Sequence, residues 1–271
     1  MARPLDDLEA RVERLGPDGG RSRGEVLFLH GAWHGAWYWE DLAGPVARAG
    51  FGVNLLDLPG HGRDPWRLPA STGLRDYALV AARAAAGLGR PVLVGHSMGG
   101  WLVQKLLEVA DLPAVLLAPL PGGGLPWLGL VRLMAACPLR MLKALAGAGM
   151  SPADARLYLR MGLAPGEELP PARLEAILRN LAPEPARVLL DMGLGLARAR
   201  PAPGGSPRLL VAAEHDFFMP LGAMRGLARR LGARLEVLSG VGHNLWLTDG
   251  GRRVVPLLLE FLEGACPSQG G

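Results

Sequence analysis

The sequence contains very little cysteine and lysine. Its two cysteines, Cys137 and Cys266, are far apart and fall in no CxxC or metal-ligand spacing. That excludes a zinc module or a disulfide-stapled scaffold and predicts isolated thiols in a reducing compartment. Lys105 and Lys143 are the only lysines, and the arginines that give the net charge of +4 are dispersed. Because there is no basic run with interleaved aromatic residues, we expect no nucleic-acid partner.

Long apolar runs are also lacking. The closest candidate, Leu125 to Met141, is broken by Arg132 and Arg140, so we expect no stable membrane insertion. The N-terminal segment is acidic and polar after Arg3 and has no apolar core of a signal peptide. These features predict a cytoplasmic protein.

What the chain does contain is material for a buried core, since 49% of its residues are hydrophobic and 20% are charged. Six short runs are apolar almost throughout, which is typical of parallel strands covered on both faces. These predicted strands are Glu25–His30, Gly52–Leu58, Pro91–His96, Ala114–Ala118, Arg208–Ala213 and Arg234–Leu238. The stretch Leu8–Leu15 fits either an extra edge strand or a short helix.

Segments with helical spacing alternate with these strands, which predicts an α/β fold with a doubly wound, mostly parallel sheet. The predicted helices are Leu74–Leu88, Gly99–Val109, Leu221–Leu231 and Arg252–Leu262.

The alternation stops between Ala118 and Arg208, where no strand pattern occurs. We therefore predict a core formed by residues 1–118 and 204–271, with a helical lid inserted at 119–203. Helical spacing in the insertion covers Val131–Leu145, Ala153–Met161, Ala172–Leu181 and Ala186–Leu196.

The sharpest local motif is Gly95-His96-Ser97-Met98-Gly99, which matches the pattern G-x-S-x-G. A predicted strand leads into it and a predicted helix follows. Such a turn places the serine at a strained apex and requires glycine two residues before and after it. Ser97 is the predicted nucleophile, although a simple Gly-Ser turn between strand and helix would give the same letters.

A serine nucleophile needs a base, and enzymes with this elbow supply an acid and then a histidine further along the chain. Only His215 and His243 lie well downstream of Ser97. His243 follows the last predicted strand, and Asp216 follows the preceding strand, so we assign His243 as base and Asp216 as its orienting acid. Glu214 is the alternative acid, whereas Asp191 falls within the insertion and is discounted.

An oxyanion hole requires two backbone N–H donors. One should come from Met98, directly after the nucleophile, and the other from the loop His30–Trp37, with Ala32 preferred over Trp33. The tryptophans of this loop could equally serve only to pack it onto the sheet. The turn Asp57–Gly62 (DLPGHG) is interpreted as structural, with Asp57 holding it by side-chain hydrogen bonds rather than pairing with His61.

These blocks together resemble the α/β-hydrolase superfamily, over about residues 25 to 262. The resemblance rests on HGAWHGAWYW, DLPGHG, GHSMGG, Glu214–Asp216 with Pro220, and Gly242–His243. The HGAWHGAW loop is most similar to the branch of esterases and hydroxynitrile lyases that includes the plant methylesterases. The insertion contains none of these motifs.

The resemblance implies hydrolysis of an ester through an acyl-enzyme, with no metal and no organic cofactor. Ser97 separates the chain from relatives with Asp at that position, such as epoxide hydrolases and haloalkane dehalogenases. Lyase relatives usually carry Thr after the His-Gly pair and Lys near the site. Here those loop positions are Ala32 and Trp33, and neither lysine lies near a motif.

A lid at this place would line the substrate pocket, which we expect to bind a small to medium hydrophobic ester. The predicted pocket residues are Trp33, Leu120, Trp127, Met134, Phe217 and Trp246, with Leu130, Met141, Met150, Met161, Phe218 and Leu247 as further candidates. Packing of lid helices against one another would explain the same residues.

Two other functions remain open at this point: cleavage of a C–C or C–CN bond by the same triad, and a non-catalytic ligand-binding protein of the same fold. The presence of all three triad residues favours an enzyme. The expected partner is a small-molecule substrate, and the expected state is a monomer or homodimer.

Overall fold

The computed structural model describes residues 11–16, 22–63, 67–145, 152–202, 204–248 and 252–266. Its centre is a seven-stranded sheet in the order β1-β3-β2-β4-β5-β6-β7. The strands are β1 (Arg11–Leu15), β2 (Glu25–Leu29), β3 (Gly52–Asp57), β4 (Val92–His96), β5 (Ala114–Leu117), β6 (Arg208–Ala213) and β7 (Arg234–Leu238). All neighbours are parallel except β1, which runs antiparallel to β3. The predicted sheet is therefore confirmed.

The stretch Leu8–Leu15, whose sequence fits either an edge strand or a short helix, contains the strand β1 over Arg11–Leu15. It pairs along β3 from Arg11 opposite Asp57 to Leu15 opposite Val53. Its side chains are exposed or partly buried, as expected for an edge strand that faces water on one side.

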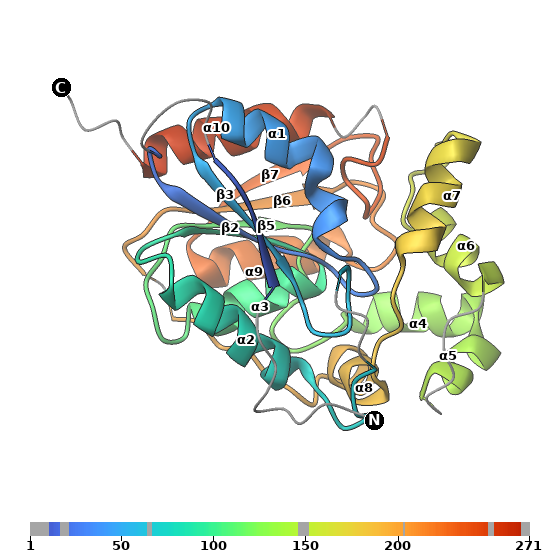
Figure 1. The fold of residues 1–271 in the computed structure, drawn as a ribbon. Coiled ribbons are helices and arrows are strands. Elements are labelled where there is room, and N and C mark those ends of the chain that lie inside the picture. The colour runs from blue at the N-terminus through green and yellow to red at the C-terminus, as the bar shows by residue number, and fades with distance from the viewer. Residues whose placement is uncertain are drawn as a thin grey trace.

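Helices cover both faces of the sheet (Figure 1). On one face lie α1 (Glu40–Arg48) and α10 (Val254–Ala265), and on the other lie α2 (Leu74–Ala86), α3 (Met98–Leu106) and α9 (Leu221–Leu231). Alternate strand residues enter the two cores: Val26 and Phe28 pack on the α1 side, and Leu27 and Leu29 on the α2 side. The helix α1 and the preceding 3₁₀ turn η2 (Ala36–Trp39) were not predicted.

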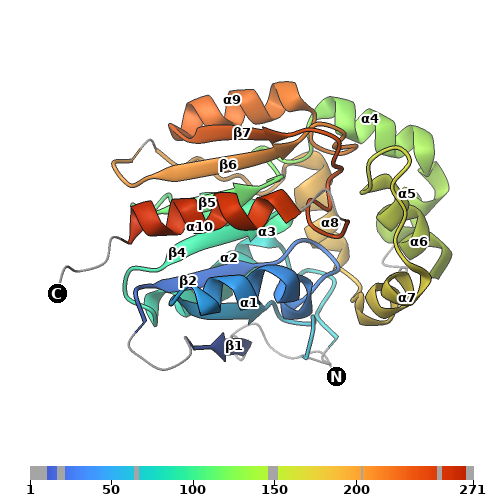
Figure 2. The ribbon, with the colours of Figure 1, turned by 90° about the horizontal axis from the view of Figure 1, so that it is seen from above.

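The described part of the connection from β5 to β6 contains the helices α4 (Trp127–Ala136), α5 (Pro138–Leu145), α6 (Pro152–Met161), α7 (Pro171–Asn180) and α8 (Ala186–Leu194). Figure 2 shows α4 to α7 grouped beyond one end of the sheet. The single helix predicted over Val131–Leu145 is instead two helices. The break comes at Pro138, which cannot donate a helical hydrogen bond. Within the described ranges, no helix is long and apolar enough to span a bilayer.

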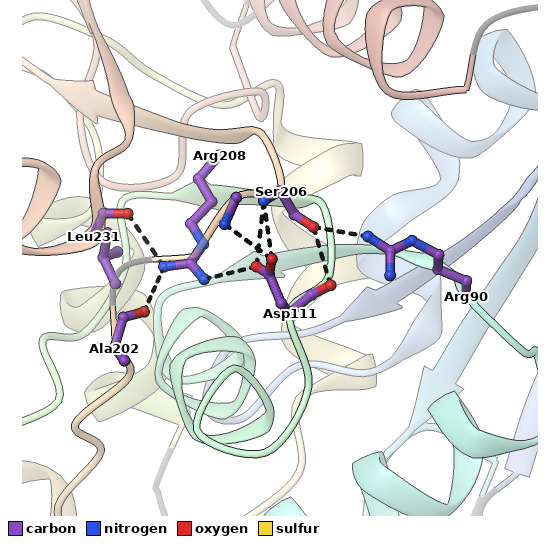
Figure 3. Close-up of polar contacts among 7 residues, drawn as sticks. Arg90, Asp111, Ala202, Ser206, Arg208 and Leu231 are labelled. Atoms are coloured by element: carbon purple, nitrogen blue, oxygen red, sulfur yellow. Dashed lines mark hydrogen bonds and ion pairs between the residues drawn. The ribbon is translucent and has the colours of Figure 1, made fainter.

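The return from α8 to β6 is fixed at the amino end of the strands by a polar cluster around Arg208 (Figure 3). Its guanidinium donates to the backbone oxygens of Ala202 and Leu231 at 2.9 and 3.2 Å and pairs with Asp111 at 3.2 Å. Asp111 also accepts from the Ser206 N–H. This Arg208 cluster joins the connections α3–β5, α8–β6 and α9–β7 at the amino ends of the strands.

Candidate active site

Ser97 occupies the sharp turn between β4 and α3, with φ of +52° and ψ of −115°. Non-glycine residues rarely adopt this conformation, so the surrounding chain must hold it in place. A Cβ on Gly95 would lie 2.4 Å from the carbonyl oxygen of Gly99, and one on Gly99 would lie 1.9 Å from that of Leu29. The elbow therefore requires glycine at both flanking positions.

Ser97, His243 and Asp216 form one hydrogen-bonded line. His243 Nε2 lies 3.0 Å from Ser97 Oγ, and His243 Nδ1 lies 2.8 Å from Asp216 Oδ2. The second carboxylate oxygen of Asp216 accepts the backbone N–H groups of Phe218 and Met219, both at 2.8 Å. A carboxylate anchored in this way orients the imidazole so that Nε2 can accept the serine proton.

The other acids considered from the sequence lie elsewhere. Glu214 accepts the Gly240 N–H at 2.9 Å and lies 3.7 Å from the exposed ring of His215. Asp191 is buried and accepts the Leu74 N–H at 3.0 Å, which anchors the start of α2. The structure therefore brings Asp216, and neither Glu214 nor Asp191, to the ring of His243.

Backbone donors for an oxyanion come from the two predicted segments. Met98 is the first residue of α3, and the first N–H groups of a helix have no intrahelical acceptor. Ala32 lines the cavity beside Ser97. The Trp33 N–H, the second choice in the loop, instead donates to Glu184 Oε1 at 2.9 Å. Ala32 and Met98 therefore remain the predicted donors.

A cavity of about 160 Å³ opens beside Ser97 and His243. That is roughly tenfold the space needed for one water molecule, so an organic group can enter. Most of its lining is apolar and comes from the insertion and from the loop after β6, including Leu120, Leu125, Leu133, Tyr158, Met161, Met192 and Phe218. Charged residues of the lining are Arg140, Lys143, Asp154 and Glu184.

Two predicted pocket residues, Trp33 and Leu120, line this cavity. Trp127 and Met134 lie on the outer surface of α4, where the residues are 75% and 41% exposed, so the structure does not bring them to Ser97. Helical spacing alone cannot tell the inner from the outer side of a helix that is apolar on both.

The other predicted pocket residues, Phe217 and Trp246, do not line the cavity beside Ser97. Phe217 lines a separate pocket formed with α6, and Trp246 is buried against Trp39, with ring centroids 4.9 Å apart. Among the further candidates, Met161 and Phe218 line the cavity, whereas Leu130 and Leu247 are not part of its lining. The side chains of Met141 and Met150 lie outside the described residues.

The fold also brings Lys143 to the cavity, although its sequence position lies far from every motif. It reaches the site from α5, which packs against α8 in the insertion. Contacts of this kind between distant helices carry no local sequence signal.

Three further histidines, His30, His34 and His96, are buried in this part of the core and are held neutral by their environment. Burial lowers the pKa of His34 from 6.5 to about 4. Burial also lowers the pKa of His30 and His96 well below the ordinary range, with nearby imidazoles adding to the effect. His30 Nε2 accepts the Leu58 N–H at 3.1 Å, which requires an unprotonated nitrogen.

The turn Asp57–Gly62 is held as expected. Asp57 Oδ1 accepts the Ala36 N–H at 2.6 Å and Oδ2 accepts the Arg63 N–H at 3.3 Å, with no bond to His61. The partner of His61 is Glu184, 3.0 Å away. Sequence reasoning missed Glu184, because a single acid between two prolines matches no motif.

The doubly wound sheet and the Ser97–His243–Asp216 line are together typical of α/β hydrolases. Comparison with known protein families tests this assignment. The model of the family described as "Alpha/beta hydrolase family" matches residues 26–257, so the chain belongs to that family. The predicted superfamily and fold class are thereby confirmed.

Curated relatives match only in part. "Probable esterase PIR7A" of Oryza sativa subsp. indica is 41% identical over 94 residues, which cover 34% of this chain and 35% of the relative. "Lipase LipV" of Mycobacterium tuberculosis is 34% identical over 99 residues, 36% of each chain. The chain thus spans about a third of the length of the curated relatives it matches.

Among solved structures, the esterase of Exiguobacterium antarcticum superposes with a TM-score of 0.78 over 95% of this chain and 97% of that one. Its sequence identity is 18%, so this similarity concerns the fold.

Proposed function

We propose that the protein hydrolyses carboxylic esters through an acyl-enzyme formed on Ser97. The observation that carries this proposal is the line from Ser97 Oγ through the His243 ring to Asp216, at 3.0 and 2.8 Å. The similarity to proteins named as esterase and lipase supports the same chemistry.

In the acylation step, His243 Nε2 takes the hydroxyl proton while Ser97 Oγ attacks the ester carbonyl carbon. The carbonyl oxygen becomes an oxyanion, which the N–H groups of Ala32 and Met98 stabilise. As the tetrahedral intermediate collapses, the bond to the alkoxy oxygen breaks and the proton on His243 passes to the leaving alcohol. The acyl group is then bonded to Ser97.

Deacylation repeats these steps with water. His243 removes a proton from water, the hydroxide attacks the acyl carbon, and the Ser97 alkoxide leaves and regains its proton from His243. Asp216 stays ionised throughout and stabilises the imidazolium that forms twice per turnover. No metal or organic cofactor is required by this scheme.

We further propose that residues 119–203 act as the lid over the site and that the substrate is a small to medium hydrophobic ester. The apolar residues that the insertion contributes to the cavity, among them Leu133, Tyr158 and Met192, support this. Hydrolysis of p-nitrophenyl esters of increasing acyl length measures the preference. A preference for strongly polar or charged esters would contradict it.

The decisive experiment compares wild type with Ser97→Ala on p-nitrophenyl acetate and butyrate, with labelling by a fluorophosphonate. Wild type should turn over and become labelled. Ser97→Ala should do neither, with kcat lowered by about 10⁶-fold, as for loss of other serine nucleophiles.

If wild type neither hydrolyses esters nor becomes labelled, the ester hydrolase proposal is wrong. Cyanohydrin cleavage is then assayed, because Lys143 lines the cavity and lyase relatives carry a lysine near the site.

A further inference from the structure

Glu184 lies in the connection between α7 and α8 and contacts three separate parts of the core. Its Oε1 accepts the Trp33 N–H at 2.9 Å and the His61 Nε2–H at 3.0 Å, and its Oε2 accepts the Tyr77 hydroxyl at 3.0 Å. The side chains of Glu184 and His61 are both fully shielded from solvent. A buried carboxylate at such a junction must be compensated, because an unpaired charge in the interior is strongly unfavourable.

The hydrogen bonds of His61 indicate that it is the compensating cation. Its Nδ1 lies 3.0 Å from the Pro59 carbonyl oxygen and its Nε2 lies 3.0 Å from the Glu184 carboxylate. The Pro59 carbonyl can only accept, and so can the Glu184 carboxylate in its ionised form, which the lowered pKa of Glu184 favours. Both ring nitrogens then carry hydrogen, and the ring is an imidazolium. Other titratable groups near this ring are Asp57, Tyr77, His30 and His34.

The pKa values agree with this charge state. Burial opposes the charge on His61, but attraction to Glu184 and hydrogen bonds to Glu184 and to the Pro59 carbonyl raise the pKa of His61 above 6.5. Burial likewise opposes ionisation of Glu184, yet His61 and the Trp33 and Tyr77 donors hold the pKa of its carboxyl below the ordinary range.

This ion pair fixes a strained peptide beside the nucleophile. Trp33 has φ of +65°, a conformation that bulky residues avoid. Both of its backbone groups are held by the same short segment of the insertion: its N–H by Glu184 and its carbonyl oxygen by the Ala182 N–H at 2.9 Å. Such strain persists only where the surroundings impose it.

We propose that Glu184 is a positioning residue for the oxyanion site. Held by His61, it fixes the Ala32–Trp33 peptide and so aims the neighbouring Ala32 N–H at the cavity. It also occupies the Trp33 N–H, which leaves Ala32 as the donor of this loop. The inference rests on the proposed esterase function, in which the oxyanion forms at that place.

A positioning role makes a specific kinetic prediction. The oxyanion forms in the tetrahedral intermediate and the transition states on either side of it, and is absent from the bound ester, so a misplaced donor should lower kcat and leave the Michaelis constant nearly unchanged. Binding of a trifluoromethyl ketone, whose adduct with Ser97 carries an oxyanion, should weaken in parallel with kcat. A substrate contact made by Glu184 would instead change KM.

The test uses Glu184→Ala, which removes every contact of the carboxylate, and Glu184→Gln, which keeps one oxygen acceptor without the charge. For hydrolysis of p-nitrophenyl butyrate, we expect kcat to fall about 100-fold for Glu184→Ala and about 10-fold for Glu184→Gln. KM should stay within about threefold of wild type. Asp111→Asn is the matched control, because it removes one charge from the Arg208 cluster at the amino ends of the strands, away from Ser97.

Amide hydrogen exchange of residues 32–34 gives a readout independent of turnover. Loss of the carboxylate should speed exchange of the Trp33 amide by about 10-fold or more, while exchange in β4 stays slow. Folded Glu184 variants with wild-type kcat, or with a changed KM alone, would overturn the proposal, as would unchanged exchange at Trp33. If wild type shows no ester hydrolysis, the esterase function fails, and the exchange result still decides whether Glu184 holds the loop.

Discussion

Two of the charged clusters that join the insertion and its return to the core lie at opposite ends of the strands, and the two differ in burial. At the carboxyl ends of the strands, Glu184 and His61 are both fully buried. At the amino ends, Arg208 is buried, but 47% of the Asp111 side chain is exposed. Water can reach the exposed partner of Arg208, whereas both members of the Glu184–His61 pair are shielded from bulk solvent. The first cluster therefore tolerates change less than the second.

The two ends of the strands also differ in backbone strain. The described non-glycine residues with positive φ are Trp33, Ser97 and Ala118, and each directly follows or lies close beyond the carboxyl end of a strand. The Arg208 cluster involves no such residue. Strained backbone conformations cluster at functional sites, so this difference supports a functional site at the carboxyl ends of the strands.

After the loss of Ser97 itself, the largest expected effect is that of Asp216→Asn. The amide can no longer hold His243 in the tautomer that accepts the serine proton, so kcat should fall about 10⁴-fold. Thermal stability should change little, because the amide oxygen can still accept the N–H groups of Phe218 and Met219. Steady-state kinetics on p-nitrophenyl butyrate and a thermal melt measure both. A loss of less than tenfold in kcat would argue against the proposed role of Asp216.

The next largest effect is expected for His61→Asn. This change leaves the Glu184 carboxylate buried without a cation, which should cost about 3–5 kcal/mol of the free energy of unfolding. Urea denaturation measures the cost as a lower midpoint at an unchanged slope. If the cost were no greater than that of Asp111→Asn, the two clusters would be equivalent and the contrast drawn from burial would be wrong.

The buried histidines should make the stability of the protein depend on pH. In the folded state His30, His34 and His96 have lowered pKa values, so the unfolded chain binds more protons below pH 6.5. Stability should therefore fall as the pH drops from 6.5 towards about 4, by up to about 1.4 kcal/mol per pH unit for each histidine.

His61 acts in the opposite direction, because its raised pKa gives stability that is lost as the pH rises above 6.5 through the folded value. We thus expect maximal stability near neutral pH, measured by urea midpoints from pH 4.5 to 9. A midpoint that rises steadily on acidification would contradict this expectation.

How far the sequence predicted these features depends on whether the signal is local. Buried parallel strands are continuous apolar runs, and all six predicted strands occur with ends shifted by at most one residue. The elbow around Ser97 was found because a strand, three glycines and a helix lie in one short stretch. Asp216 and His243 were found because each follows a strand end, where the edge of a parallel sheet brings them together.

Features set by contacts between distant segments were missed. Glu184 lies 151 residues from Trp33 and 123 from His61, so no spacing rule connects them. The directions of the Trp127 and Met134 side chains depend on how α4 packs beyond the end of the sheet (Figure 2), which a helical period cannot specify. The helix α1 was missed because Pro45 lies within it and its apolar positions are few.

The smallest expected effect is that of Asp111→Asn. Arg208 keeps its bonds to the carbonyl oxygens of Ala202 and Leu231, and water can reach the site of the lost charge. The melting temperature should therefore fall less than for His61→Asn, and kcat on p-nitrophenyl butyrate should stay within twofold of wild type, a margin of roughly 0.4 kcal/mol in barrier height. Thermal melts and steady-state kinetics of the two variants side by side give the comparison. If Asp111→Asn lowered kcat as Glu184→Gln does, the amino edge would also be coupled to the chemistry, and a loss of kcat in the Glu184 variants could no longer be assigned to the loop that carries Ala32.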